Sequence, residues 1–98
     1  MAENLVVIAY LTAKPGKEAE ARKNIQALVA PTRTEAGCIT YDLHEMHGET
    51  AKFVFYEVWK SAEHLNAHAK SKHLTKFREI SPDFLVGTVD LTMWRKIE

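Results

Sequence analysis

The sequence predicts an α+β domain in which one antiparallel sheet carries two helices on a single face. Four segments are rich in β-branched and aromatic residues, two others repeat apolar residues at helical spacing, and glycine or proline separates several of them. Their order is β-α-β-β-α-β, the ferredoxin-like arrangement. We expect residues 1–98 to form this single domain, because 98 residues fit one domain and no linker or repeat interrupts them.

The first strand is followed by one helical segment. Residues 5–11 are a continuous apolar run, which is typical of a strand buried on both faces. Pro15 and Gly16 punctuate the chain after this strand. Apolar residues then recur at helical spacing over residues 21–36, which predicts a continuous helix that stops at Gly37.

The middle of the chain predicts a hairpin of two strands. Apolar and polar residues alternate from Cys38 to Met46, as they do in a strand with one buried face. Residues 47–50 are turn-like, and residues 53–59 form a second strand with bulky side chains on both sides. Two such strands joined by a short turn pair in the antiparallel sense.

The last third of the chain predicts a helical region and a closing strand. Ser61 can cap the start of the region, since its hydroxyl can accept a backbone N–H. Helical spacing of apolar residues continues to Ile80, and Ser81 and Pro82 end it. We expect residues 86–97 to complete the sheet.

The strands carry more bulky side chains than two helices should cover. Side chains alternate across a strand, so six residues are not expected to lie together beneath the helices: Tyr10, Tyr41, Phe53, Phe55, Trp59 and Val89. A large exposed apolar face marks an interface. The same face of a second copy would cover it, so we expect a homodimer of two packed sheets, a dimeric barrel, with Trp94 at the seam. The alternative is a solvated and unusually apolar sheet.

Composition and charge exclude several kinds of partner. Thirteen basic residues balance thirteen acidic ones, so neither nucleic acid nor an anionic membrane surface is expected to bind. The apolar run at residues 5–11 is far too short to cross a membrane. Cys38 is the single cysteine, which excludes an internal disulfide, and the first four residues lack the basic segment of a signal peptide. We therefore expect a cytoplasmic protein.

Three histidines leave three interpretations open. A metal site would use His64, His68 and His73, but His73 lies roughly 140° round an unbroken helix from His68, and no nearby cysteine completes the set. If the helix breaks near Ser71, His68 and His73 both face a pocket, where neutral imidazole can accept a phenolic or enolic proton. The third interpretation is that the histidines are surface residues. We expect no metal.

Glu57 interrupts an apolar strand, because it stands between Phe55 and Trp59. A carboxylate in that position is either buried and paired or lines a cavity, and both environments alter its pKa. Pairing with a lysine or arginine at the surface is the alternative. Tyr41 is expected in the core, with its hydroxyl at the rim of the same pocket.

Several segments resemble the antibiotic biosynthesis monooxygenase (ABM) family, closest to its small bacterial quinol-monooxygenase-like members. The resemblance covers almost the whole chain and rests on residues 14–17, 30–33, 35–43 and 55–59, then on His68, the step at residues 71–73, and Phe77. These motifs together are fairly specific for the family and the fold, and they are weak for the substrate.

The resemblance implies a dimeric α+β barrel that oxygenates quinols or polyphenols with O₂ and uses no flavin, haem or metal. An electron-rich phenolate can itself reduce O₂, so the protein needs only to deprotonate it, hold it and exclude water. His68, His73 and Glu57 would then form the catalytic set. Aromatic side chains would contact the substrate rings: Tyr41, Phe55, Trp59 and Phe77.

The resemblance also leaves alternatives. A haem-degrading branch relies on Asn, Trp and His at positions that hold Ala9, His68 and Arg78 here, which argues against haem cleavage. A branch that acts on a quorum-sensing signal shares a His-x4-His step like His68 to His73, so an isomerase of a small enolisable ketone is the second hypothesis. A dimeric ligand-binding protein without catalytic activity is the third.

Overall fold

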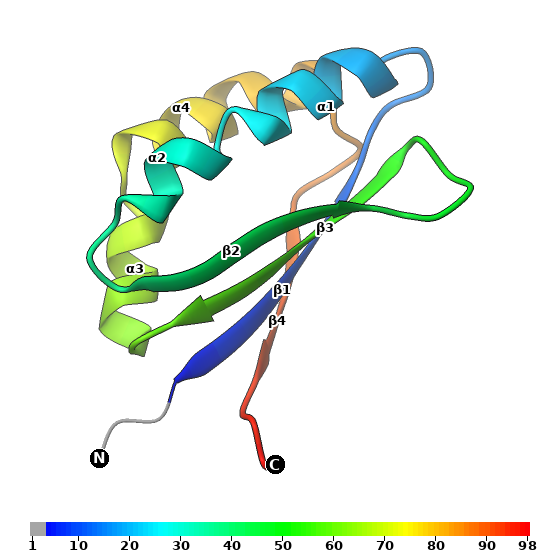
Figure 1. The fold of residues 1–98 in the computed structure, drawn as a ribbon. Coiled ribbons are helices and arrows are strands. Elements are labelled where there is room, and N and C mark those ends of the chain that lie inside the picture. The colour runs from blue at the N-terminus through cyan, green and yellow to red at the C-terminus, as the bar shows by residue number, and fades with distance from the viewer. Residues whose placement is uncertain (1–3) are drawn as a thin grey trace.

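Four antiparallel strands form one sheet, and the helices lie on one of its faces (Figure 1). The computed structural model describes residues 4–98, so the first three residues of the predicted domain lie outside the described residues. The strands are β1 (Leu5–Thr12), β2 (Cys38–Glu45), β3 (Lys52–Trp59) and β4 (Asp90–Trp94). The helices are α1 (Glu18–Gln26), α2 (Val29–Arg33), α3 (Ala62–Ala69), α4 (Lys72–Ile80) and the short 3-10 helix η1 (Ser81–Asp83).

The strand order β2-β3-β1-β4 confirms the ferredoxin-like prediction. The hairpin predicted in the middle of the chain is the β2–β3 pair, and β1 lies in the centre of the sheet between β3 and β4. None of the helices in the described part of the chain has the length and hydropathy needed to cross a bilayer.

The prediction of one continuous helix over residues 21–36 is wrong. The helix α1 ends at Gln26, and α2 begins at Val29. Pro31 explains the break, because it has no N–H to donate to the carbonyl of Ala27 and its ring crowds that carbonyl. The chain therefore bends, and α2 packs against β2.

The last strand is shorter than predicted, since β4 spans only five of the residues between 86 and 97. The N–H of Val86 donates to the carbonyl of Thr12 at 2.8 Å, which ties the start of this segment to the end of β1. Gly87 then adopts a positive φ of 63°, a conformation that glycine adopts readily. This residue turns the chain before β4 begins.

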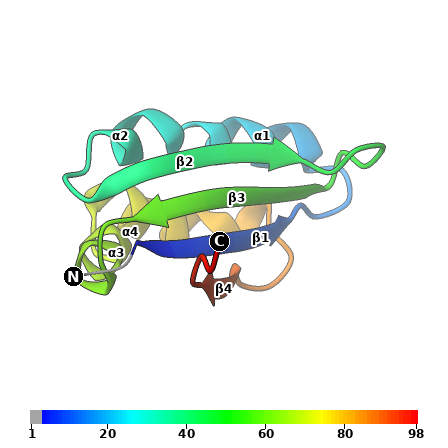
Figure 2. The same cartoon turned by 60° about the horizontal axis from the view of Figure 1, so that its bottom comes forward.

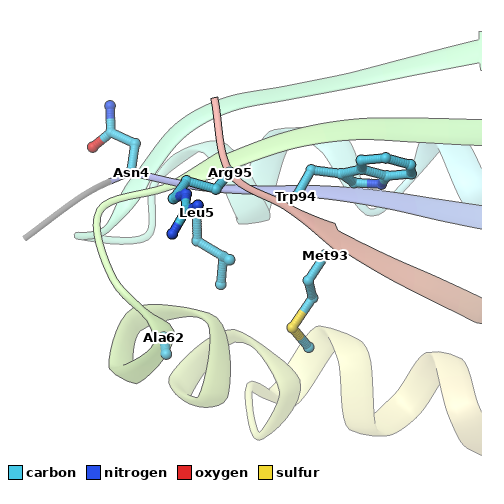
Figure 3. Close-up of a pocket in the computed structure, with 6 residues that line it drawn as sticks. All are labelled: Asn4, Leu5, Ala62, Met93, Trp94 and Arg95. Carbon is cyan, nitrogen blue, oxygen red and sulfur yellow. The ribbon is translucent and has the colours of Figure 1, made fainter. Parts of the chain in front are cut away.

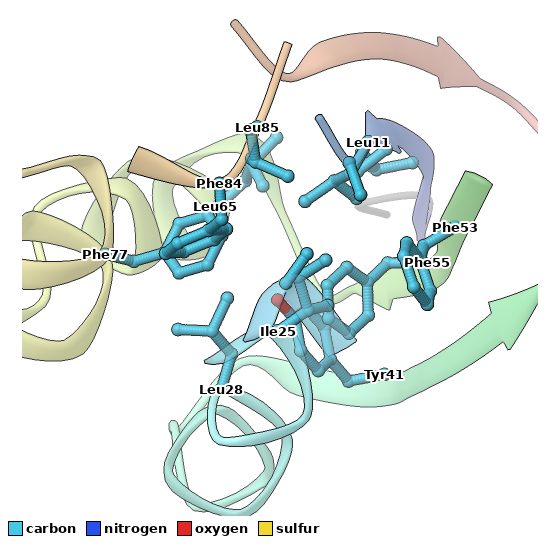
Figure 4. Close-up of a cluster of buried hydrophobic side chains, with 14 of the residues drawn as sticks. Leu11, Ile25, Leu28, Tyr41, Phe53, Phe55, Leu65, Phe77, Phe84 and Leu85 are labelled. Atoms are coloured by element: carbon cyan, nitrogen blue, oxygen red, sulfur yellow. The ribbon is translucent and has the colours of Figure 1, made fainter. Parts of the chain in front are cut away.

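The core lies between the sheet and the helices. Side chains at alternate positions of β3 form the centre of the buried face: Phe53, Phe55, Glu57 and Trp59. The ring of Tyr41 stacks on that of Phe55, with 4.3 Å between the ring centroids. Figure 4 shows these two rings on one side of the layer, with Ile25 of α1 and Phe77 of α4 reaching toward them from the helices.

The helices cover more of the sheet than the sequence analysis predicts. Tyr41, Phe53, Phe55 and Trp59 are each at most 2% exposed, and Val89 packs against the same core. The three β3 residues of this set occupy alternate positions, so a single face carries all of them. Of the six residues that were not expected to fit there together, only Tyr10 lies on the opposite face.

The opposite face is nevertheless apolar, so the prediction of a second apolar face is confirmed, with Tyr10 and Trp94 on it. Its apolar side chains come from β1, β3 and β4: Val6, Ile8, Tyr10, Val54, Tyr56, Val58 and Trp94. We call this set the open face. Tyr10, Tyr56 and Trp94 are 42%, 42% and 53% exposed. In Figure 2 the strands lie in front of the helices, and no described helix covers this side.

Candidate functional site

A cavity of about 520 Å³ lies between the sheet and the helices α3 and α4, and we call it the main cavity. This volume is within the range of pockets that bind small molecules. Its inner walls are largely apolar and aromatic, with Tyr41, Phe55 and Phe77 among them. Its ionisable side chains, apart from the Tyr41 hydroxyl, are Glu57, His68 and Arg78.

Five of the seven predicted site residues line the main cavity: Tyr41, Phe55, Glu57, His68 and Phe77. The other two, Trp59 and His73, do not line it. Trp59 is fully buried beside it, with its ring 4.6 Å from that of His68, and its indole N–H donates to Glu57 Oε1 at 2.8 Å. His73 lies next to His68, with 6.1 Å between the ring centroids.

The break at Ser71 brings the two histidines together. Of the interpretation that both would face a pocket, the structure agrees for His68, which lines the main cavity, and not for His73. The helix α3 ends at Ala69, and Ser71 takes an extended conformation before α4 begins. The hydroxyl of Ser71 accepts the backbone N–H of Leu74 at 3.3 Å, which caps the new helix. His64 stays apart from the pair, since its Nδ1 is 2.8 Å from the hydroxyl of Ser61.

Glu35 joins the two histidines, a role that no pattern in the sequence predicted. Its Oε2 lies 2.7 Å from Nδ1 of His68 and 2.8 Å from Nε2 of His73. An ionised carboxylate only accepts hydrogen bonds, so both ring nitrogens donate to it. His68 therefore carries its proton on Nδ1, and its Nε2 is left as an acceptor.

Glu35 was missed because nothing local in the sequence points to it. It lies between α2 and β2, and 33 and 38 residues separate it from the two histidines. Only the tertiary fold places this connection beside the break between α3 and α4. The one available signal was that Glu35 opens the family-like segment at residues 35–43.

Burial controls the protonation of the groups in the main cavity. Loss of hydration lowers the pKa of His68, and its hydrogen bond to Glu35 opposes that shift. Burial raises the pKa of Glu57 to about 7, with a smaller opposing effect of the Trp59 N–H. Burial, assisted by the nearby Glu57 carboxylate, also raises the pKa of Tyr41. Near neutral pH the site thus holds a neutral imidazole, a half-protonated carboxyl and a protonated phenol.

One group of described residues has donor atoms that could hold a metal ion, and we call it the Glu35 trio: Glu35, His68 and His73. The three ligand atoms of Glu35, His68 and His73 lie within 4.8 Å of one another. The three-histidine set considered from the sequence does not form, because His64 points to Ser61. Hydrogen bonds at 2.7 and 2.8 Å account for the closeness of the trio, and they use the same nitrogen and oxygen atoms that an ion would need.

A second cavity of about 390 Å³ lies at the end of the sheet where β1 begins and β4 ends (Figure 3). Its lining residues are Asn4, Leu5, Ala62, Met93, Trp94 and Arg95. None of these side chains is an imidazole, a carboxylate or a thiol, so this cavity is not a candidate for acid–base chemistry.

The fold and the main cavity define a small α+β protein with an aromatic pocket and an acid–base pair. The chain matches the model of the family described as antibiotic biosynthesis monooxygenase over residues 4–80. It therefore belongs to this family, and the resemblance seen in the sequence is confirmed.

Several proteins are similar to this chain over most of its length. The uncharacterized protein sll1783 of Synechocystis is 32% identical over 94 residues, which are 96% of this chain and 64% of that relative. The "Putative monooxygenase YcnE" of Bacillus subtilis is 33% identical over 87 residues, which are 89% of this chain and 92% of YcnE. The crystal structure of PA3566 from Pseudomonas aeruginosa has a TM-score of 0.94 at 32% identity, covering 100% of this chain and 98% of that one.

Proposed function

We propose that the protein oxygenates a quinol or a polyphenol with O₂ in the main cavity and needs no resident cofactor. The observation that carries this proposal is the hydrogen bond from His68 Nδ1 to Glu35, since it leaves Nε2 of a neutral imidazole as the acceptor in a cavity-lining ring. Such a base can take the phenolic proton of a bound quinol. The family membership supports the same class of reaction.

The reaction balances without an external reductant. His68 takes the phenolic proton, and the phenolate gives one electron to O₂. The resulting radical pair combines at a ring carbon next to the phenolic one and forms a C–O bond. The imidazolium of His68 returns its proton to the outer oxygen, which gives a hydroperoxide. Loss of the hydrogen on the same ring carbon then breaks the O–O bond, so one oxygen atom stays on the ring and the other leaves as water. The product is a hydroxyquinone, and the quinol itself supplies all four electrons.

Proton transfer to His68 is feasible on energetic grounds. A phenol with a pKa near 10 gives its proton to an imidazole with a pKa near 6.5 at a cost of about 5 kcal/mol in water. A turnover of about one per second corresponds to a barrier of about 17 kcal/mol, so this cost fits within it. The burial that lowers the pKa of His68 adds to the cost, and the Glu35 carboxylate reduces it by stabilising the imidazolium.

The other site residues have supporting roles in this proposal. Glu35 positions His68, and His73 positions Glu35 through its own hydrogen bond. The protonated form of Glu57 can donate to an oxygen of the substrate, because its pKa of about 7 leaves it half protonated near neutral pH. Trp59 fixes Glu57 and packs on His68. Phe55, Tyr41 and Phe77 would contact the aromatic rings and exclude water.

The test is incorporation of labelled oxygen into a naphthohydroquinone. Purified protein is incubated with 2-methyl-1,4-naphthohydroquinone and ¹⁸O₂, and mass spectrometry detects the hydroxyquinone with one labelled atom. We expect product formation well above autoxidation for the wild type, a loss of at least tenfold for His68→Gln, and no loss for His47→Ala, an exposed histidine in the β2–β3 turn. Equal rates in wild type and His68→Gln would contradict the role of His68.

The same incubation without oxygen distinguishes the proposed oxygenase from an isomerase and from a ligand-binding protein. An isomerase of an enolisable ketone would turn over without oxygen, whereas the proposed oxygenase would not. A ligand-binding protein without catalysis would bind the hydroquinone and form no labelled product in either atmosphere.

We also propose that the open face is covered by a second copy of the chain. Tyr10, Tyr56 and Trp94 are too exposed for an apolar sheet face that stays in water. Sedimentation equilibrium should give twice the monomer mass of 11.1 kDa for the wild type. Substitution of Tyr56 by arginine should shift the equilibrium toward monomer, and a wild type that is monomeric at 100 μM would refute the proposal.

A further inference from the structure

We propose that Arg78 selects substrates that carry an acidic group, with that group held at the mouth of the main cavity and the phenol turned inward. The inference rests on the proposed function for the reaction, but the binding preference itself is independent of turnover. A preference of this kind narrows the substrate class to quinols or phenols that carry a carboxylate or similar anion at the end remote from the reacting hydroxyl.

The helix α4 places Arg78 on the cavity side. Leu74, Phe77, Arg78 and Ser81 all line the main cavity, and their spacing of three, four and seven residues puts them on one helical face. Phe77 is buried whereas Arg78 is exposed, so Arg78 lies where the cavity opens to solvent. Asn66, Ser81 and Thr88 add polar side chains to the lining.

The guanidinium of Arg78 makes one hydrogen bond to the backbone of the neighbouring helix. Its Nη2 donates to the carbonyl of Ala69 at the end of α3, at 2.5 Å. One nitrogen of the fork is therefore used to tie α3 to α4 across the break at Ser71. A guanidinium has five N–H donors in a fixed plane, so donors remain for a carboxylate.

Charge in the main cavity is distributed in a way that orients an anion. Arg78 is the one permanent cation among the described residues that line it. Glu57 is 3% exposed at the buried side, and Glu35 lies behind His68. An acidic group on a ligand is thus attracted to the mouth, because none of the described residues at the inner end of the main cavity is a permanent cation. A neutral phenol has no such restriction and can reach His68.

The preference should depend on Arg78 alone, although other cations lie nearby in the sequence. Lys70, Lys72 and Lys76 are exposed and do not line the main cavity. At about 0.1 M ionic strength, the interaction between exposed charges is largely screened beyond about 10 Å. Lys76→Gln therefore removes the same charge from the same helix and serves as a matched control.

The experiment measures binding of 6-hydroxy-2-naphthoic acid and of its methyl ester by calorimetry at about 0.1 M ionic strength, where the exposed lysines are screened. The two ligands share the phenol and the rings and differ in the anion. We expect wild type and Lys76→Gln to bind the acid about tenfold more tightly than the ester, which corresponds to about 1.4 kcal/mol for a charge-assisted contact. Arg78→Gln should lose the preference, and Arg78→Lys should retain part of it.

Binding of the ester serves as the internal control. Unchanged ester affinity in Arg78→Gln would show that the cavity is intact and that only the recognition of the anion is lost. Equal affinity of the wild type for both ligands, or an acid preference that survives Arg78→Gln, would overturn the inference. A preference that depends on Lys76 would also overturn it. If the protein binds the acid more tightly than the ester but forms no oxygenated product, the proposed function is refuted and the role of Arg78 in binding stands.

Discussion

Replacing Glu57 with glutamine should remove a large pH dependence of folding stability. Burial raises the pKa of Glu57 from 4.5 to about 7. Between these two values the folded chain keeps a proton on Glu57 that the unfolded chain has lost. Stability therefore falls as the pH rises, because the native state binds more protons than the unfolded state. Below pH 4.5 both states are protonated, and Glu57 has little effect.

The magnitude follows from the two pKa values. A difference of 2.5 pKa units corresponds to about 3 kcal/mol, which is fully lost only above pH 7. The glutamine side chain of the Glu57→Gln variant has no charge to bury, and its oxygen can still accept the indole N–H of Trp59. The free energy of unfolding of Glu57→Gln, minus that of the wild type, should thus rise by about 3 kcal/mol between pH 4.5 and pH 8.

The assay is urea unfolding of both proteins across this pH range, followed by circular dichroism. Taking the difference between the two proteins cancels the contributions of the other groups. The lowered pKa of His68 acts in the opposite sense, since it reduces stability as the pH falls below about 6.5. A difference that stays constant from pH 4.5 to pH 8 would refute the assignment of a raised pKa to Glu57.

Three further predictions test the site and its packing. Glu35→Gln should reduce kcat/KM by about 10- to 100-fold, because an amide can also donate to Nδ1 of His68 and so favour the wrong tautomer. Steady-state kinetics of the labelled-oxygen reaction measure this value. An unchanged kcat/KM would exclude a positioning role for Glu35. Phe77→Ala should cost about 3 kcal/mol of stability in urea unfolding, since its ring is 4% exposed, and a loss below 1 kcal/mol would contradict its place in the core. Turnover should survive treatment with EDTA, because hydrogen bonds already satisfy the donor atoms of the Glu35 trio. Loss of activity that Zn²⁺ or Fe²⁺ restores would show instead that the reaction needs a metal ion.

The topology was predictable from the sequence because each of its signals is local. Periodicity and turn residues define the strands, and a hydroxyl before a helical run marks a cap, as at Ser61 and Ser71. The effect of Pro31 was also available locally, yet the apolar spacing on both sides of it concealed the break. Proline chemistry outweighed the periodicity there.

The division of residues between the two faces of the sheet was less predictable. A run such as residues 53–59 has bulky side chains at every position, so alternation alone does not say which set is buried. The structure places the odd-numbered residues, Glu57 included, under the helices. The register of β3 with β1 and β2 determines which side chains share the buried face, and this pairing is a property of the whole chain.

The candidate site was half predictable for a related reason. Glu57 could be named because it is a polar group among apolar neighbours, and His68 because a helix break near Ser71 would turn it and His73 toward one pocket. Glu35 is an ordinary acidic residue in an ordinary connection, and only its contact with two histidines gives it meaning. Arg78 likewise matters through the cavity that α4 lines and not through its neighbours in sequence.

The arrangement of charge indicates how the main cavity would support the proposed oxygenation. A buried imidazole is a poor base, because burial opposes the imidazolium that proton transfer creates. The Glu35 carboxylate at 2.7 Å from Nδ1 counteracts this cost on the side away from the substrate. On the substrate side, a phenolate in an apolar cavity would be equally unfavourable, and the protonated form of Glu57 can stabilise it by donating a hydrogen bond at the inner end.

Arg78 acts at the other end of the main cavity, on an anion remote from the reacting hydroxyl. For a quinol that carries a carboxylate, Glu35→Gln and Arg78→Gln together should therefore reduce kcat/KM by roughly the product of their separate effects. Glu35 affects proton transfer and Arg78 affects binding, and contributions from independent groups add as free energies. Steady-state kinetics of the two single variants and the double variant measure this. A double variant no slower than the worse single variant would show that the two residues act on one step.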